Sequence, residues 1–124
     1  MKSVTIFWLL IILLIVVGVA SSFYVSAKPG KYDAVAQCLT DKGAIFYGAF
    51  WCPHCQATKR MFGSSARLLP YRECSTPDAK GQLKECTDAG VQSYPTWVFP
   101  DGTRLTGERT IEEIATAANC PLTA

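Results

Sequence analysis

The chain has 124 residues, 49% of them hydrophobic, and a formal net charge of only +2. This length suits one domain of ordinary size. The basic residues form no cluster, which excludes nucleic-acid binding from the expected functions. Six cysteines in so short a chain predict disulfide chemistry in an oxidising compartment.

An almost continuous apolar run from Val4 to Val25 follows Lys2 at the beginning of the chain. A run of this length can cross a bilayer as one helix, and the preceding lysine favours a cytoplasmic N-terminus. We therefore expect a membrane anchor over residues 1–27 and an exported domain over residues 28–124, on the periplasmic or extracellular side. A signal peptide cleaved after Val25-Ser26-Ala27 is the alternative and would give a secreted domain, although the apolar run exceeds the usual signal core.

Hydrophobic periodicity and chain-breaking residues predict the elements of the exported part. In chain order we expect a helix over 32–41, a strand over 44–50, a helix from 52 or 53 to 62, a strand over 69–74, a loop over 75–80, a helix over 81–89, a hairpin of strands 96–99 and 103–106, and a capped helix through 110–118. Alternating helices and strands followed by a hairpin predict an α/β protein with a small mixed sheet.

Two cysteines, Cys52 and Cys55, enclose Pro53 and His54 between the first strand and its helix. A cysteine at a helix start lies near unpaired N–H groups and the positive end of the helix dipole, which stabilise a thiolate. Pro53 suits the first helical position. Cys55 follows one turn later, where it can attack a mixed disulfide formed at Cys52. The spacing predicts thiol–disulfide exchange.

Other uses of this cysteine pair fit the sequence less well. A zinc site typically takes two close-set pairs of ligands, and the chain has no second Cys-x-x-C. Haem attachment requires a histidine directly after the second cysteine, where this chain has Gln56. A purely structural disulfide would close a very tight loop, and such pairs are usually labile. We therefore expect no metal site and no cofactor.

The position of the cysteine pair, together with Tyr94-Pro95-Thr96 before a later strand, resembles the thioredoxin fold. Segments 46–56, 70–74 and 90–97 narrow the resemblance to the thioredoxin-like domain that is fused to, or paired with, bacterial homologues of vitamin K epoxide reductase. The resemblance implies a cis peptide bond before Pro95, with an ordinary trans bond as the alternative. It also implies that the backbone of Tyr94 and Pro95 holds an extended substrate.

Four residues are accordingly expected to contact substrate: Trp51, Pro53, Tyr94 and Thr96. We expect Trp51 to form an exposed apolar rim beside Cys52. A large indole more often packs in a core, and this is our expectation for Trp97.

The chain departs from ordinary thioredoxin at two places. Phe46 stands six residues before Cys52, where thioredoxin has a buried aspartate that accepts the proton of the second cysteine. Between its cysteines the chain has Pro-His, as in DsbA, instead of Gly-Pro. A hydrogen bond from His54 would stabilise the reduced thiolate, and a stabilised reduced form is a stronger oxidant. A solvated His54 with little effect is the alternative.

The resemblance therefore implies a protein thiol–disulfide oxidoreductase with Cys52, Cys55, His54 and Pro95 in its active site. Its substrates would be cysteine-containing exported proteins. A quinone-linked membrane partner, related to vitamin K epoxide reductase or to DsbB, would reoxidise it. A reductase or isomerase of the same fold, a non-catalytic peptide-binding module and a metal-delivery protein are the alternatives.

The four remaining cysteines are expected to form structural disulfides. The related domains imply a bridge between Cys74 and Cys86, and a second redox relay is the alternative. In a thioredoxin-like layout the helices next to Cys38 and Cys120 end on the same side of the sheet, which implies a bridge between these two residues. A covalent dimer through either of them is the alternative.

Overall fold

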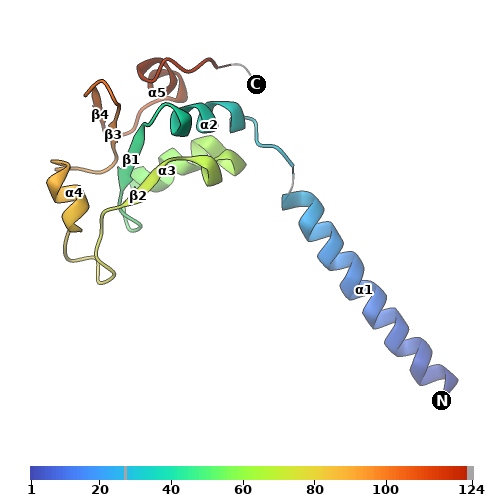
Figure 1. Cartoon of the computed structure of the whole chain (residues 1–124). Helices are drawn as coiled ribbons and strands as arrows, with labels where there is room; N and C mark the ends of the chain where they lie inside the picture. The colour runs from blue at the N-terminus through green and yellow to red at the C-terminus, as the bar shows by residue number, and fades with distance from the viewer. Residues whose placement is uncertain (27, 123–124) are drawn as a thin grey trace.

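The computed structural model describes residues 1–26 and 28–122 (Figure 1). Ala27, the last residue of the expected anchor and of the alternative cleavage site, lies outside the described residues. So do residues 123–124, at the end of the expected domain. The described part contains one long N-terminal helix, followed by five shorter helices and four strands.

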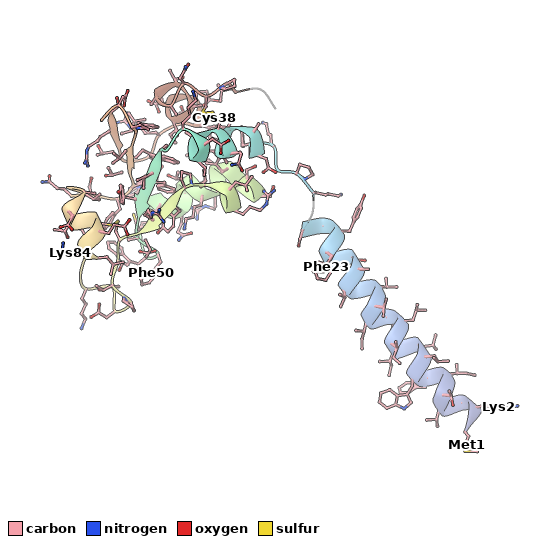
Figure 2. All side chains as sticks on the ribbon, viewed as in Figure 1. Met1, Lys2, Phe23, Cys38, Phe50 and Lys84 are labelled. Carbon is pink, nitrogen blue, oxygen red and sulfur yellow. A yellow bond between two sulfur atoms is a disulfide. The ribbon has the colours of Figure 1, made fainter. Side chains whose placement is uncertain are left out.

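Helix α1 (Lys2–Ser26) is apolar all round, and none of its residues is buried. Figure 2 shows its side chains pointing outward on every side, with Lys2 at its beginning. Its length and composition would allow it to cross a membrane, but a signal sequence near the N-terminus passes the same test. Both the anchor and the signal peptide are therefore compatible with this helix.

Four strands form one mixed sheet in the order β2-β1-β3-β4. The central strand β1 (Ile45–Gly48) pairs in parallel with β2 (Tyr71–Glu73) on one side. On its other side it pairs antiparallel with β3 (Thr96–Val98), which is joined by a tight turn to β4 (Arg104–Thr106). The predicted mixed α/β class is thus confirmed.

Successive residues of β1 point to opposite faces of the sheet and enter two separate cores. Phe46 stacks on Trp97 of β3 with ring centroids 4.6 Å apart, and Trp97 is fully buried as expected. Tyr47 faces the other way and packs with Cys74, Cys86 and Val91. Three helices also supply side chains to the larger core, namely α2 (Asp33–Asp41), α3 (Pro53–Phe62) and α5 (Ile111–Ala117).

Two disulfides link the same cysteines that the sequence analysis paired. Cys38 of α2 is joined to Cys120 just beyond α5, with their Cα atoms 5.9 Å apart. Figure 2 labels Cys38 on the helix that follows the long N-terminal helix. Cys74, directly after β2, is joined to Cys86 of α4 (Lys84–Asp88) at a Cα separation of 5.6 Å. Each bridge therefore fastens a helix to a segment outside it, across 82 residues in the first case and 12 in the second.

Two predicted elements differ from the structure. The first difference directly follows α3. No element is predicted for residues 63–68, but Gly63–Leu68 forms a 3₁₀ helix, η1. Ser65 of η1 is buried and accepts a hydrogen bond from the backbone N–H of Tyr32, which ties η1 to the start of α2. Helix α4 begins three residues later than predicted, because Gln82 pairs with Ser75 in an isolated β-bridge.

Candidate functional site

Cys52 is the N-cap residue of α3, and Pro53 begins the helix. Extended backbone at Cys52 (φ −78°, ψ 119°) turns the chain from β1 into the helix. The Sγ atom of Cys52 donates a hydrogen bond to the carbonyl oxygen of Tyr94 at 3.7 Å. Cys52 is only 4% exposed, so its thiol is largely covered. A substrate must therefore fit closely against the surface around this sulfur in order to reach it.

Cys55 lies one helical turn further on and is fully buried. Both Cys52 and Cys55 are free thiols. Burial, together with hydrogen bonding and charge at Cys52, raises the pKa of Cys55 to about 12, while a backbone hydrogen bond at Ala49 and the nearby Lys59 act in the opposite direction. Cys55 is therefore a protonated thiol at neutral pH and needs a route for its proton before it can react.

Polar side chains from β2 lie next to the buried thiol. A Cβ atom on Gly48 would stand 2.9 Å from the Sγ atom of Cys55 and 2.8 Å from the Tyr71 ring. The hydroxyl group of Tyr71 donates a hydrogen bond to Glu73 at 2.8 Å. Burial raises the pKa of Tyr71, and the Glu73 carboxylate raises it further. Sequence reasoning missed both residues, since nothing in the sequence of β2 marks them as neighbours of Cys55.

The Tyr94–Pro95 peptide bond is cis. Pro95 is buried, and the carbonyl oxygen of Tyr94 faces Cys52. The side chain of Thr96 is also buried and donates a hydrogen bond to the carbonyl oxygen of Ser93 at 2.7 Å. Of these expected contact residues, only Tyr94 is therefore partly exposed beside the thiol.

Two aromatic side chains precede Cys52 on the surface. The Trp51 ring is half exposed, lies edge-on to Tyr94 at 6.0 Å between centroids, and donates a hydrogen bond from Nε1 to Ser75. The Phe50 side chain is also half exposed, and Figure 2 shows it at the edge of the molecule. Phe50 was missed by the sequence analysis, although an aromatic residue directly before Trp51-Cys52 was a usable signal.

His54 is directed to a carboxylate and makes no hydrogen bond to Cys52 within the described residues. Its Nδ1 atom lies 2.6 Å from the Oε1 atom of Glu108, in the loop between β4 and α5. The His54 side chain is 64% exposed, so this is a surface pair. Glu108 is 54 residues away in the sequence, and no pattern there connects it with the cysteines.

No known protein-family model matches this chain. One curated relative is the thiol-disulfide oxidoreductase LTO1 of Arabidopsis thaliana, which is 46% identical over 97 residues. The matched segment covers 73% of this chain and 25% of that protein. The chain thus spans about a quarter of the length of the curated relative that it matches.

Proposed function

We propose that the protein is a thiol–disulfide oxidoreductase with a thioredoxin-like domain over residues 28–124 and a membrane anchor over residues 1–27. One observation carries the proposal: Cys52 begins a helix, and the free, buried thiol of Cys55 lies one turn behind it. The helix N-terminus favours negative charge on the Cys52 sulfur. The 46% identity to a protein of this name supports the same chemistry.

The proposed cycle begins with Cys52 and Cys55 joined by a disulfide. A substrate thiolate attacks the Cys52 sulfur, the bond between the cysteines breaks, and Cys55 leaves with the electron pair and takes up a proton. A second substrate thiolate then attacks the substrate sulfur of the mixed disulfide and releases Cys52 as a thiolate. The substrate loses two electrons and gains a disulfide, while the protein gains two electrons and ends as a dithiol.

The surface around Cys52 suits an extended segment of a cysteine-containing protein. Phe50 and Trp51 offer apolar contact area beside the sulfur. The backbone N–H of Tyr94 makes no hydrogen bond within the described part of the chain, so a substrate backbone can accept one there. Apolar contact without charged recognition would admit many unfolded substrates.

We infer that the protein works outside the cytoplasm and donates disulfides. Two further disulfides in the same small domain suit an oxidising compartment. The dithiol left after each cycle needs an oxidant, which we propose is a quinone-linked membrane protein related to vitamin K epoxide reductase or to DsbB. Helix α1 would keep the domain near such a partner.

The decisive experiment measures the redox equilibrium of the full-length chain in detergent, using glutathione buffers and mass spectrometry to locate free thiols. We expect only Cys52 and Cys55 to titrate reversibly, with a potential nearer to about −120 mV, as in DsbA, than to about −270 mV, as in thioredoxin. A value near the thioredoxin potential would make the protein a reductase.

A matched activity assay separates exchange from mere peptide binding. The oxidised protein should introduce a disulfide into a reduced dithiol peptide, and a Cys52→Ser variant should not. The Cys55→Ser variant, mixed instead with the peptide in its disulfide form, should accumulate a mixed disulfide at Cys52, because the internal thiol that would release the peptide is absent. Full retention of cellular function in a variant lacking both thiols would contradict the proposal and favour a peptide-binding module.

A further inference from the structure

Behind the active-site helix, a buried thiol and a tyrosine hydroxyl both lie against Gly48 of β1. Gly48 of β1 is aligned with Glu73 of β2, and Phe46 is aligned with Tyr71. The point where a Gly48 Cβ would stand lies 2.9 Å from the Cys55 sulfur and 3.4 Å from the Tyr71 hydroxyl oxygen. The absence of a side chain at Gly48 therefore allows both groups to pack against the same position of β1.

The Tyr71 hydroxyl is held in place by a fixed carboxylate. It donates a hydrogen bond to Oε2 of Glu73 at 2.8 Å. The other carboxylate oxygen accepts the backbone N–H of Ser75 at 2.9 Å and that of Phe50 at 3.2 Å. Three donors thus orient Glu73. Because Glu73 is only partly buried, it can also exchange protons with water.

A lysine supplies positive charge over the ring of the tyrosine. Lys59 follows Cys55 by one helical turn, and its Nζ atom lies 3.6 Å from the centroid of the Tyr71 ring. This charge favours the thiolate form of Cys55. Besides Lys59, the titratable groups around Cys55 are Cys52 on α3 and Tyr71 and Glu73 on β2. On the outer surface, His54 of α3 pairs with Glu108.

We propose that Tyr71 and Glu73 form a proton relay that serves Cys55. The inference rests on the proposed function, since it concerns the reoxidation of the dithiol, in which Cys55 attacks a mixed disulfide formed between Cys52 and the oxidising partner. The proton of Cys55 passes to the Tyr71 oxygen as the Tyr71 hydroxyl proton passes to the Glu73 carboxylate. The Cys55 thiolate then attacks the Cys52 sulfur, and the partner thiolate leaves with the electron pair.

The relay would give the buried Cys55 thiol a path along which it can lose its proton. A fully buried thiol with a raised pKa forms its thiolate rarely in neutral water, and Phe46 offers no acceptor on the neighbouring strand. Within the relay, Glu73 ends the step as a neutral carboxylic acid and later releases its proton to solvent. When the cycle runs the other way, the same path returns a proton to Cys55 as it leaves the disulfide.

The test follows the Cys55 step directly in the reduced, full-length protein in detergent. The chromogenic disulfide 5,5′-dithiobis(2-nitrobenzoate) forms a mixed disulfide with Cys52 and releases one thionitrobenzoate. Attack by Cys55 then releases a second thionitrobenzoate at a rate independent of reagent concentration. With an internal base, this second rate should change little between about pH 6 and pH 9.

Two variants should remove the internal base. In Tyr71→Phe and in Glu73→Gln, the second release should be about 100-fold slower near neutral pH and should rise tenfold with each pH unit, because it depends on hydroxide. The double variant should be no slower than either single variant, since one relay is lost in each case. Tyr47→Phe is the matched control, because Tyr47 is a buried tyrosine of β1 that faces the other core.

The outcomes separate the relay from the proposed function. A wild-type protein that never releases the second thionitrobenzoate would contradict disulfide exchange itself. A wild-type protein that releases it, with a flat pH profile retained in a folded Tyr71→Phe or Glu73→Gln variant, would overturn the relay alone. Circular dichroism identifies which variants are folded, and either one of the two suffices for this decision.

Discussion

Gly48 and Cys55 approach each other so closely that a Cβ on Gly48 would stand 2.9 Å from the Cys55 sulfur. The same atom would stand 2.8 Å from the Tyr71 ring. Helix α3 can therefore press its second cysteine against β1 only because this strand position lacks a side chain. The packing that buries the thiol is set by a strand residue as much as by the helix.

A Gly48→Ala substitution should accordingly destabilise the protein and disturb the thiol. Forcing one methyl group into this space should cost about 1–3 kcal/mol of unfolding free energy. The displaced Cys55 should also become open to alkylation. Urea denaturation and iodoacetamide labelling measure the two effects.

Gly81→Ala is the matched control for that substitution. Among the described residues, its added Cβ would meet only the partly exposed Thr76, at 3.3 Å or more. Equal stability of the two alanine variants, with Cys55 still protected in Gly48→Ala, would contradict the packing argument.

Removal of each structural disulfide should have a cost that grows with the length of the loop it closes. The loop between Cys74 and Cys86 spans 12 residues, whereas that between Cys38 and Cys120 spans 82. The chain-entropy relation gives about 3 and about 4.5 kcal/mol, respectively. Double alanine variants at each pair, compared by urea denaturation, measure this order.

The same variants test whether the Cys74–Cys86 bridge is structural. If it is, the variant without it should still oxidise a dithiol peptide at a rate close to that of the wild type under conditions where it is folded. Loss of reoxidation by membranes, with peptide oxidation intact, would instead make this bridge a second redox relay.

Acid should weaken the protein through Asp33. Arg67 of η1 makes two hydrogen bonds of 2.8 Å to the Asp33 carboxylate, and it holds the pKa of that carboxyl well below its usual range. A lowered folded-state pKa stabilises the protein above the unfolded pKa of about 3.9, and this contribution is lost as the pH falls further.

Asp33→Asn should therefore lower the urea midpoint near neutral pH and reduce its fall between about pH 5 and pH 2. Asp41→Asn, at the other end of α2, is a matched control because Asp41 accepts only a hydrogen bond from Gln37. An equally steep acid-dependent fall in the Asp33 variant and the wild type would show that this pair is not responsible.

Local patterns in the sequence were sufficient for most of the fold. The apolar run before Trp51, the capping-box spacing at Thr110 and the turn at Gly102 each act over a few residues, and the structure has the expected elements there. The start of α4 could not be predicted in this way. It depends on the pairing of Gln82 with Ser75, which local helix propensity does not report.

The same distinction between local and tertiary contacts applies to the candidate site. The helix-start position of Cys52 follows from residues next to it in the sequence. The contacts of Tyr71 and Glu108 depend on which strand lies beside β1 and on where the loop after β4 ends. No local sequence pattern identifies residues that act across the sheet, because tertiary packing determines which residues are their neighbours.

Glu108 should weaken the protein as an oxidant, because it neutralises a cation next to the active-site cysteines. The His54 imidazole lies 2.6 Å from the Glu108 carboxylate, and both side chains are largely exposed. A protonated His54 imidazolium favours a Cys52 thiolate, and the carboxylate offsets that field. Glu108→Gln should therefore stabilise the reduced form and shift the glutathione equilibrium towards it.

Solvent screening should keep this shift below about tenfold and should reduce it further in high salt. Glu112→Gln, which removes the same charge from α5, should leave the equilibrium unchanged. The shift should also shrink when Glu108→Gln is made in a His54→Asn background, because the cation is then absent. A shift towards the oxidised form in Glu108→Gln would show that the carboxylate acts chiefly by keeping His54 charged, and would reverse the assigned role.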